Sequence, residues 1–375
     1  MRAISCLLAA AFVLAARFSV AATDPVSTSF QVDPAHDGAV TFSTPFVPPL
    51  TKRWSLSLGG PVSYPVVAGN IAVVIVGGAI GTHLVAVNVT TGKVVWQKLV
   101  SGASYLASDN GKIFLTTSEG PFQAFDGVTG RGLWSTQLPG QFFFDFVPVA
   151  SGGFIYAGGD ESGTTLYKID EADGKVTWQK QYPAGGAGVT LGDSYLLTLP
   201  MPCNVPGLNA NSGRQIWYYR SGCDGGGGGV AAYYQHRLYA PDVNVPSGVI
   251  LNTYTGKTVG GLSGGAPAFF GNTLITISGS SLVASNIYTG NLIWHYTPKN
   301  DTFSTPPIVI NGNVYTLSDN GVLYVNAGFR GRLVQTIAVK LGNQSSIVGA
   351  PSSGLGVANG LLLVPSGSNL AAFGP

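Results

Sequence analysis

The sequence predicts an all-β fold in which eight four-stranded antiparallel sheets form a ring. Three observations lead to this prediction. A motif ending in tryptophan returns about every forty residues, a hairpin pattern lies between successive copies, and no stretch shows sustained helical periodicity. Each unit of about forty residues therefore supplies one small sheet, and the units repeat along most of the chain.

The repeated motif is A-x-D-x-x-T-G-K-x-x-W. Clear copies are AVNVTTGKVVW (Ala86 to Trp96), AFDGVTGRGLW (Ala124 to Trp134), KIDEADGKVTW (Lys168 to Trp178), GLNANSGRQIW (Gly207 to Trp217) and ASNIYTGNLIW (Ala284 to Trp294). Its glycine recurs at Gly92, Gly130, Gly174, Gly213, Gly256, Gly290 and Gly331, with spacings of 38, 44, 39, 43, 34 and 41. Two copies are degraded, because Gly260 and Gln335 stand where tryptophan is expected.

Each unit contains two hairpins. Between motifs the sequence alternates apolar β-formers with an Asn/Gly turn, as in PVVAGNIAVVIV from Pro65 and PIVINGNVYTLS from Pro307. The motif makes the second hairpin, since A-x-D ends a strand, glycine supplies a positive φ in the turn, and K-x-x-W begins the next strand. Two hairpins make a four-stranded antiparallel sheet.

Such sheets must bury both faces, and a ring of blades, the β-propeller, does this without exposed sheet ends. A large flat side chain recurring once per sheet is expected to anchor adjacent blades, burying roughly 150–250 Å² each time. All six tryptophans of the chain occupy this position: Trp54, Trp96, Trp134, Trp178, Trp217 and Trp294.

The two ends of the chain carry complementary halves of one motif. Trp54 in KRWSLSL has no A-x-D-x-x-T-G before it, and the final NLAAFGP repeats the A-x-D strand with no turn or tryptophan after it. We therefore expect the N-terminal strand to complete the last blade and close the ring. The prediction is eight blades over residues 50–375 in one domain, with seven as the alternative if the region near Arg330 is not a full unit.

The first residues resemble a targeting segment. Residues 1–22 have a basic start, an apolar run and small residues at Ala21 and Ala22, as in a cleaved signal peptide, and residues 23–49 form a lead-in to the propeller. We therefore expect a secreted or periplasmic protein. No later apolar run approaches the roughly 20 residues of a spanning helix.

Charge excludes two classes of partner. Removing residues 1–22 leaves 17 basic and 17 acidic residues, so the mature chain is close to neutral. Nucleic acids and anionic membranes are bound largely through clustered Lys and Arg, which this chain lacks. We expect a monomer that binds another protein or an extracellular ligand.

The tryptophan motif is similar to the docking motif of the pyrroloquinoline quinone (PQQ) propeller repeat, and DPAHDGAV (Asp33 to Val40) resembles the usual lead-in of that superfamily. The superfamily includes quinoprotein alcohol dehydrogenases and a bacterial outer-membrane barrel-assembly scaffold. The resemblance to the dehydrogenases implies a quinone held between a tryptophan and a disulfide of adjacent cysteines, beside calcium. This chain has no Cys-Cys pair and no spare tryptophan, so we expect no cofactor and no catalysis, as in the scaffold-type members.

No other catalytic pattern stands out. The four histidines, His36, His83, His236 and His295, lie in separate units without metal-ligand spacing, so no metal site is predicted. Nucleophile-elbow and phosphate-loop motifs are missing from the sequence, and CDGGGGGV from Cys223 lacks the lysine of a phosphate loop. The alternative function is an enzyme using the central funnel, either quinone-dependent or acting on carbohydrate through carboxylates such as Asp145, Asp160 or Asp242.

One aromatic stretch is a candidate contact patch. GQFFFDFVP places Phe142, Phe143, Phe144 and Phe146 at the entry to an innermost strand. Because successive residues of an extended chain point to opposite faces, the four rings cannot all enter one seam between blades. Some are expected to reach the surface, where an exposed aromatic patch favours protein contact, while inter-blade packing accounts for the rest.

Three sequons would be glycosylated on the surface if the host is a eukaryote. They begin at Asn88, Asn300 and Asn343.

The two cysteines of the mature chain generate a testable prediction. Cys203 and Cys223 lie at the open end of the hairpin that contains Trp217, in a chain expected to be exported, which favours a disulfide over two buried thiols. The bridge would close about 20 residues and contribute on the order of 3 kcal/mol. Thiol titration of the unfolded, unreduced mature protein should detect no free cysteine, whereas two titratable thiols would contradict the pairing.

Overall fold

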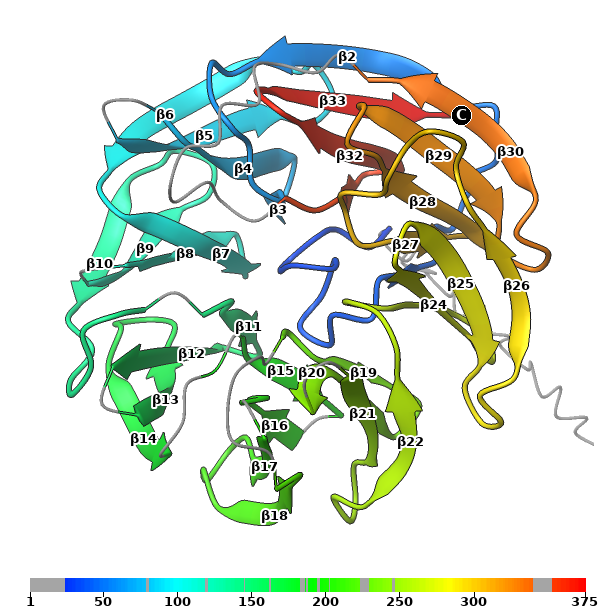
Figure 1. Cartoon of the computed structure of the whole chain (residues 1–375). Coiled ribbons are helices and arrows are strands. Elements are labelled where there is room, and N and C mark those ends of the chain that lie inside the picture. Colours follow the sequence, from blue (N-terminus) through cyan, green and yellow to red (C-terminus); the bar gives the residue numbers. More distant parts are fainter. Residues whose placement is uncertain are drawn as a thin grey trace, which may run out of the picture.

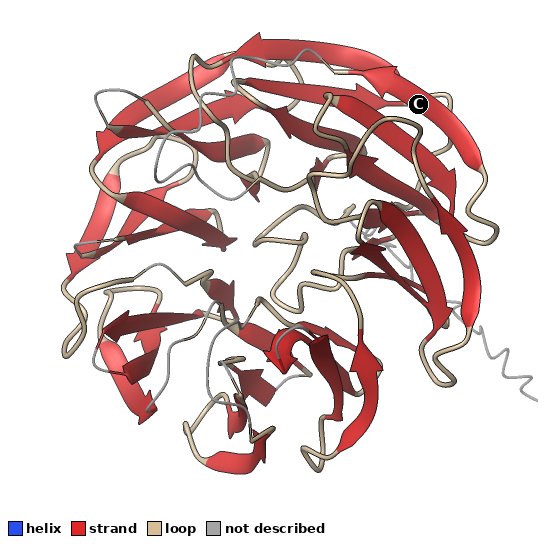
Figure 2. Ribbon diagram, viewed as in Figure 1, coloured by secondary structure: helices blue, strands red, loops and turns tan. Residues whose placement is uncertain are grey.

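The computed structural model describes residues 24–78, 81–118, 121–144, 146–161, 163–182, 186, 188–193, 196–201, 203–222, 229–244, 247–339 and 353–375. All regular structure in these residues is β-strand, as Figure 2 shows. None of them forms a helix long and apolar enough to cross a membrane. The predicted signal peptide, residues 1–22, lies outside the described residues.

The predicted ring of eight blades is confirmed (Figure 1). Within each blade the strands pair antiparallel, from an inner strand beside the ring axis to an outer strand at the rim. Blade 1 comprises β3 (Val66–Ala68), β4 (Ile71–Val76), β5 (Thr82–Asn88) and β6 (Val94–Val100), and blade 2 comprises β7 (Ala103–Asp109), β8 (Lys112–Thr117), β9 (Phe122–Asp126) and β10 (Gly132–Thr136). Blade 3 comprises β11 (Val149–Ser151), β12 (Phe154–Glu161), β13 (Gly163–Asp170) and β14 (Val176–Tyr182), and blade 4 comprises β15 (Thr190–Gly192), β16 (Leu196–Thr198), β17 (Asn204–Asn209) and β18 (Gln215–Arg220).

The second half of the ring repeats this plan. Blade 5 comprises β19 (Ala232–Tyr234), β20 (Arg237–Asn244), β21 (Ser247–Asn252) and β22 (Thr258–Leu262), and blade 6 comprises β23 (Ala268–Phe270), β24 (Thr273–Ser278), β25 (Ser281–Asn286) and β26 (Leu292–Tyr296). Blade 7 comprises β27 (Ile308–Ile310), β28 (Asn313–Leu317), β29 (Val322–Ala327) and β30 (Leu333–Ala338), joined by the short β1 (Ala39–Val40). Blade 8 comprises β31 (Gly356–Ala358), β32 (Leu361–Ser366), β33 (Asn369–Gly374) and β2 (Thr51–Ser57).

Blade 8 confirms the predicted closure. Its outer strand β2 comes from the N-terminal part of the chain and pairs antiparallel with β33, with Trp54 opposite Ala372 and Ser57 opposite Asn369. Figure 1 shows the two strands side by side at the rim. The eighth unit is complete because each end of the chain supplies what the other lacks, and the region near Arg330 belongs to a full blade 7.

In blades 1 to 7 the two hairpin turns lie on the same face of the ring, which we call the turn face. Their backbones are hydrogen-bonded to each other: Val89 N–H donates to Asn70 O at 2.9 Å in blade 1, and Ile287 N–H donates to Asn272 O at 3.0 Å in blade 6. The connections between blades and the central turn of each blade lie on the opposite face, the loop face.

The motif turn is held by its Asx residue and its glycine. In blade 1, Asn88 Oδ1 accepts hydrogen bonds from Thr91 N–H and Thr91 Oγ1, at 2.9 and 3.1 Å, and Gly92 N–H donates to Asn88 O at 2.8 Å. Gly92 has a φ of 68°, which glycine adopts without strain. In blade 7 Ala327 replaces the Asx residue, so the side-chain bonds are lost while the backbone bond from Gly331 to Ala327 remains at 2.7 Å.

Each tryptophan lies on the motif glycine of the next blade. An ideal Cβ built on Gly130 would be 2.7 Å from Trp96 Cδ2, and one on Gly331 would be 2.4 Å from Trp294 Cε3. The indole N–H donates to the carbonyl three residues before that glycine. The acceptors of Trp54, Trp96, Trp134, Trp178, Trp217 and Trp294 are the carbonyls of Val89, Gly127, Glu171, Ala210, Thr253 and Gly328, at 2.7 to 3.3 Å. Six seams therefore share one contact.

The cross-strand neighbour of the tryptophan is small in five of the six blades that have one; in blade 3 it is Lys168, opposite Trp178. The cross-strand neighbour is alanine in four blades: Ala86 opposite Trp96, Ala124 opposite Trp134, Ala284 opposite Trp294 and Ala372 opposite Trp54. In blade 4 it is Gly207, whose Cβ would be 2.1 Å from Trp217 Cε2. Where tryptophan is missing the neighbour is large, with Ile250 opposite Gly260 and Val325 opposite Gln335.

The two seams without tryptophan differ. Between blades 7 and 8, Gln335 bonds both backbone groups of Leu50, accepting from its N–H at 2.8 Å and donating to its carbonyl at 3.0 Å. Between blades 5 and 6, Gly260 has no side chain to offer, and no described atom lies within 4 Å of a Cβ built on Gly290. The first seam is filled by a polar side chain, and the second is open.

The lead-in segment occupies the middle of the ring, where Figure 1 shows it in dark blue. Residues 27–40 contact the inner region of all eight blades through hydrogen bonds. Backbone partners are Val67, Ser108, Leu191, Tyr233, Val309 and Val357, one each in blades 1, 2, 4, 5, 7 and 8, and side chains of the segment reach Pro148 in blade 3 and Pro267 in blade 6. The chain's own N-terminal segment therefore plugs the channel that the ring surrounds.

Two buried side chains of this plug bind carbonyl groups. Gln31 Nε2 donates to Pro267 O at 3.1 Å and to Pro307 O at 2.9 Å, which joins blades 6 and 7. His36 places Nδ1 2.6 Å from Phe30 O and Nε2 2.8 Å from Val189 O. Burial lowers the pKa of His36, and the two carbonyls oppose that shift.

The docking contact can be tested with two alanine substitutions. Gly130→Ala and Gly290→Ala each place alanine at a positive φ, 70° and 72°, at a cost of about 1–2 kcal/mol. Only Gly130 carries an indole, so Gly130→Ala should lose about 1–3 kcal/mol more through overpacking. Denaturant unfolding of both variants measures the difference, and equal losses would show that the indole contact is not tight.

The plug can be tested at Gln31. In Gln31→Glu a carboxylate would face two carbonyl oxygens, so burial and repulsion should raise the pKa of the new side chain above that of an unfolded glutamate. The protonated form keeps one donor and should cost about 1–3 kcal/mol. Because the folded-state pKa is raised, stability should fall further as pH rises from about 5 to 8. Thermal unfolding against pH measures this, with Gln31→Ala as the non-titrating control; parallel pH profiles would contradict the buried carbonyl pair.

Candidate interaction surface

The phenylalanine stretch divides between surface and core. Phe142 and Phe143 are exposed on the loop face, whereas Phe144 and Phe146 are buried. The buried rings pack over two glycines of β12, since a Cβ on Gly159 would be 2.5 Å from the ring of Phe144 and one on Gly158 would be 1.9 Å from that of Phe146. Two of the four candidate contact residues thus have packing roles, and two remain available to a partner.

The remaining candidate residues lie apart. Among the described residues no three His, Cys, Asp or Glu side chains are grouped as metal ligands. His83 lies in β5 and His295 in β26. Asp160 lies at the loop face, where its backbone N–H and carbonyl are hydrogen-bonded to the backbone of Phe143. Asp145 and the side chain of Asp242 lie outside the described residues, so they stay untested as carboxylates of a funnel.

The predicted disulfide and sequons also stay predictions. Cys203 is buried, but Cys223 lies outside the described residues, as does Asn343. Asn300 is exposed, and Asn88 is half-buried with its Oδ1 engaged in the motif turn.

The residues present do not fit a quinone site of the dehydrogenase type. The sequence has three cysteines, Cys6, Cys203 and Cys223, and none is adjacent to another. All six indoles are engaged in seams. The channel is crossed by residues 27–40, which bind the inner region of every blade. No step of a reaction can therefore be assigned to these residues.

The turn face of blades 5–7 carries an exposed aromatic surface that the sequence analysis missed. It consists of Tyr254, Phe270, Tyr288 and Phe329, with exposed fractions of 54%, 39%, 55% and 72%, and we call it the aromatic arc. Three of the four occupy the same motif position, two residues before the glycine. The first four blades carry Thr90, Val128, Ala172 and Asn211 there. The arc is therefore confined to one part of the ring.

A hydrogen-bonded network anchors one end of the arc to blade 4. The turn between β19 and β20 has Gln235 and His236 at positive φ, 47° and 59°, which projects His236 onto the turn face. Its Nδ1 lies 2.9 Å from Tyr254 Oη, 3.1 Å from Tyr233 Oη and 3.2 Å from Asp193 Oδ2. Burial, with a contribution from Asp193, raises the pKa of Tyr233.

The middle of the arc links blades 5 and 6. Tyr288 Oη donates to Gln235 Oε1 at 2.7 Å, and the Arg237 guanidinium lies 5.1 Å from the centroid of the Tyr288 ring. Phe270 reaches across to blade 7, where it would be 3.1 Å from a Cβ on Gly312. Tyr288 and Phe270 are thus held in place by the neighbouring blades 5 and 7, while more than a third of each side chain remains exposed.

The sequence contains a signal for the arc. Aligning the motifs on their glycines places Tyr254, Tyr288 and Phe329 in consecutive units at a turn position, where a large aromatic side chain has no packing role. Phe270 could not be found this way, because it lies at the end of an inner strand whose exposure depends on the next blade.

An eight-bladed ring with tryptophan-docked seams defines a PQQ-like propeller. The chain belongs to the family described as outer membrane protein assembly factor BamB, whose model matches residues 81–231 and 202–372. It is 27% identical over 199 residues to outer membrane protein assembly factor BamB of Nitrosomonas eutropha, a match that covers 50% of this chain and 37% of that protein's length.

Solved structures share the fold. The crystal structure of BamB from Moraxella catarrhalis superimposes with a TM-score of 0.67 at 19% identity, covering 87% of this chain and all of that one. The quinohemoprotein alcohol dehydrogenase from Comamonas testosteroni gives a TM-score of 0.75 at 11% identity, covering 94% and 81%. Both an assembly factor and an enzyme thus use this propeller, so the fold alone does not decide function.

Proposed function

We propose that the protein is a non-catalytic propeller of the periplasm or extracellular space that binds another protein. The observation that carries the proposal is the aromatic arc. Interfaces are enriched in Tyr, Phe and Arg, and an exposed contiguous set of such residues marks a contact site. The family match to an outer membrane protein assembly factor supports a role in assembling or holding other proteins.

The arrangement of the arc suits binding better than catalysis. Tyr288 is held by Gln235 and Arg237, and Phe270 packs over Gly312. These two side chains would therefore lose little freedom when a partner covers them. The blades supply a frame, and the motif turns carry residues that differ from blade to blade. The rival is an enzyme using the funnel, and the plugged channel and the engaged indoles argue against the quinone-dependent form of it.

Site-specific photocrosslinking tests the surface. A photoreactive phenylalanine analogue should be placed at Tyr254, Tyr288 or Phe329 in protein expressed in its host, with the same analogue at Thr90 and Val128 as matched controls in blades 1 and 2. We expect one adduct of constant mass from the arc positions and none from the controls, because only the arc is proposed to meet the partner.

Two outcomes would contradict the proposal. Adducts formed only from Phe142 and Phe143 would move the interface to the loop face. A stoichiometric, calcium-dependent complex with pyrroloquinoline quinone, or oxidation of alcohols or sugars with an artificial electron acceptor well above a heat-treated control, would restore the enzyme. Quinone titration of the purified protein should instead show no binding.

A further inference from the structure

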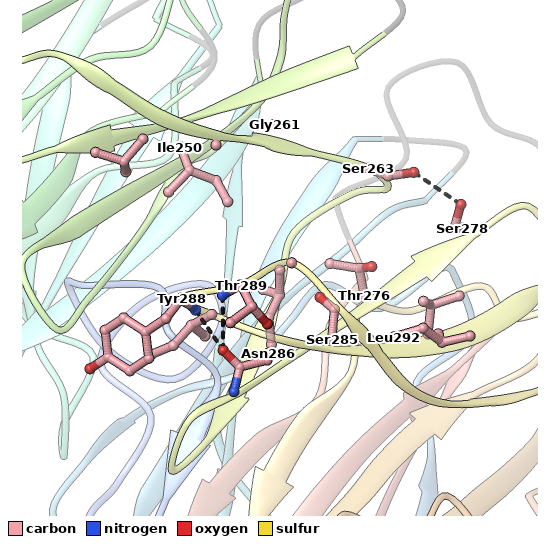
Figure 3. Close-up of a pocket in the computed structure, with 16 residues that line it drawn as sticks. Ile250, Gly261, Ser263, Thr276, Ser278, Ser285, Asn286, Tyr288, Thr289 and Leu292 are labelled. Atoms are coloured by element: carbon pink, nitrogen blue, oxygen red, sulfur yellow. Dashed lines mark hydrogen bonds between the residues drawn. The ribbon is translucent and has the colours of Figure 1, made fainter.

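The seam between blades 5 and 6 contains a pocket of about 430 Å³. Its walls come from both blades, with Ile250, Gly260 and Gly261 on one side and Ser285, Ile287 and Gly290 on the other. Figure 3 shows Ile250 and Gly261 facing Ser285, Asn286 and Thr289 across it. The volume is within the range of sites that bind organic side chains or ligands.

The pocket lies where the repeat would place an indole. Gly260 follows its motif glycine by four residues, as five of the six tryptophans do, and Gly290 is the glycine on which that indole would rest. Ile287 is three residues before Gly290, so its carbonyl has the position that accepts the indole N–H in the other six seams. One half of a docking site is therefore present, and the indole is missing.

The seam is closed by other contacts, so the pocket does not imply a weak ring. Tyr239 and Tyr234 of blade 5 pack against Phe269 of blade 6, with centroids 4.7 and 4.3 Å apart. Tyr234 Oη also donates to Gly271 O at 3.0 Å. These contacts lie at the inner and turn-face parts of the seam, which leaves the outer part available.

The pocket adjoins the aromatic arc. Tyr288 belongs to the arc and also lines the pocket, and Val259 and Leu292, both exposed, give the rim an apolar character. A polypeptide lying on the arc would therefore have the pocket within reach of a side chain. A second copy of this chain is a poor donor, because each of its six tryptophans is already docked in its own seam.

We propose that this seam is a docking site for a tryptophan side chain of a partner polypeptide, whose ring would lie between Ile250 and Gly290 and whose N–H would be donated to the Ile287 carbonyl. The site deepens the proposed function and rests on it for the existence of a partner. It makes the partner complete a contact that the ring makes internally six times. Fully desolvated tryptophans in pockets of this kind are typical anchors of protein interfaces.

The test uses short capped peptides as probes, with tryptophan or leucine between two pairs of glycines. Ligand-observed NMR titration of the full-length mature protein should show the tryptophan peptide binding at least about tenfold more tightly than the leucine peptide. The signals followed belong to the peptides, so the six tryptophans of the protein do not interfere.

Three variants place the binding in the pocket. Ile250→Ala with Gly260→Trp restores the pattern of the other seams, so it should raise the melting temperature and weaken the tryptophan peptide by at least about tenfold. Ser285→Arg should weaken binding similarly from the other wall, which covers the case in which the double variant does not fold. Ile293→Trp adds an indole to the exposed rim of blade 6, outside the pocket lining, and should bind the peptide as the parent protein does.

Each result decides the proposal. Equal binding of the two peptides, or tryptophan-peptide binding that survives both the folded double variant and Ser285→Arg, would overturn it. Tight binding of free indole with no binding of the peptide would also overturn it, in favour of a small-molecule site. Photocrosslinks from the arc together with peptide failure would leave the scaffold function standing and remove only the docking site.

Discussion

The contact on which the ring depends is an indole lying on the glycine of the next blade. It combines a glycine that accepts a positive φ and has no side chain beneath the ring with a tryptophan of the preceding blade. The cross-strand neighbour of that tryptophan is alanine or glycine in five blades and Lys168 in blade 3. The repeated motif therefore encodes one inter-blade contact, in which the tryptophan comes from one unit and the glycine from the next. Six of the eight blades give an indole to the next blade, blades 5 and 7 being the exceptions, and strand β2 makes the contact across the closure at Trp54.

A second constraint acts at the axis. Eight inner strands converge there, each with one backbone edge unpaired by its own sheet, and buried backbone groups need partners. The lead-in supplies them by passing the strands in turn, while its buried Gln31 binds the carbonyls of blades 6 and 7 and its buried His36 binds that of Val189. The sequence DPAHDG suits this path. The Asp33 and Asp37 carboxylates accept hydrogen bonds from Ala35 N–H and Ala39 N–H, which fixes tight bends in a segment that changes direction as it passes the blades. Rim contacts and an axial plug therefore hold the same ring from opposite sides.

The blade number, the four-strand unit and the closure could be predicted because they follow from local periodicity and from two incomplete motifs at the ends. The plug could not, since its partners are eight segments far apart in sequence whose meeting point exists only once the ring forms. The phenylalanine stretch shows the same limit: alternation required the four rings to divide, but only the glycines at 158 and 159 determine that Phe144 and Phe146 go inward. The sequence shows aromatic residues at Tyr254, Tyr288 and Phe329 in one motif position. That they form one surface follows only from the structure, in which all motif turns lie on the same face.

The vacant seam shows how a repeat protein can turn a structural contact into a site. Losing an indole removes a large buried contact, and the chain offsets this with Ile250 in place of the usual alanine and with the Tyr234, Tyr239 and Phe269 cluster nearer the axis. The seam between blades 7 and 8 offsets the same loss differently, by two hydrogen bonds between the Gln335 side chain and the backbone of Leu50. Two solutions to one defect thus have different consequences. Between blades 7 and 8, Gln335 takes the tryptophan position and bonds the next blade directly. Between blades 5 and 6, the stabilising aromatic contacts lie nearer the axis, and Gly290 stays uncovered beside the exposed Tyr288. Whether a degraded repeat can bind a partner thus depends on which residue replaces the tryptophan and on where in the ring that repeat lies.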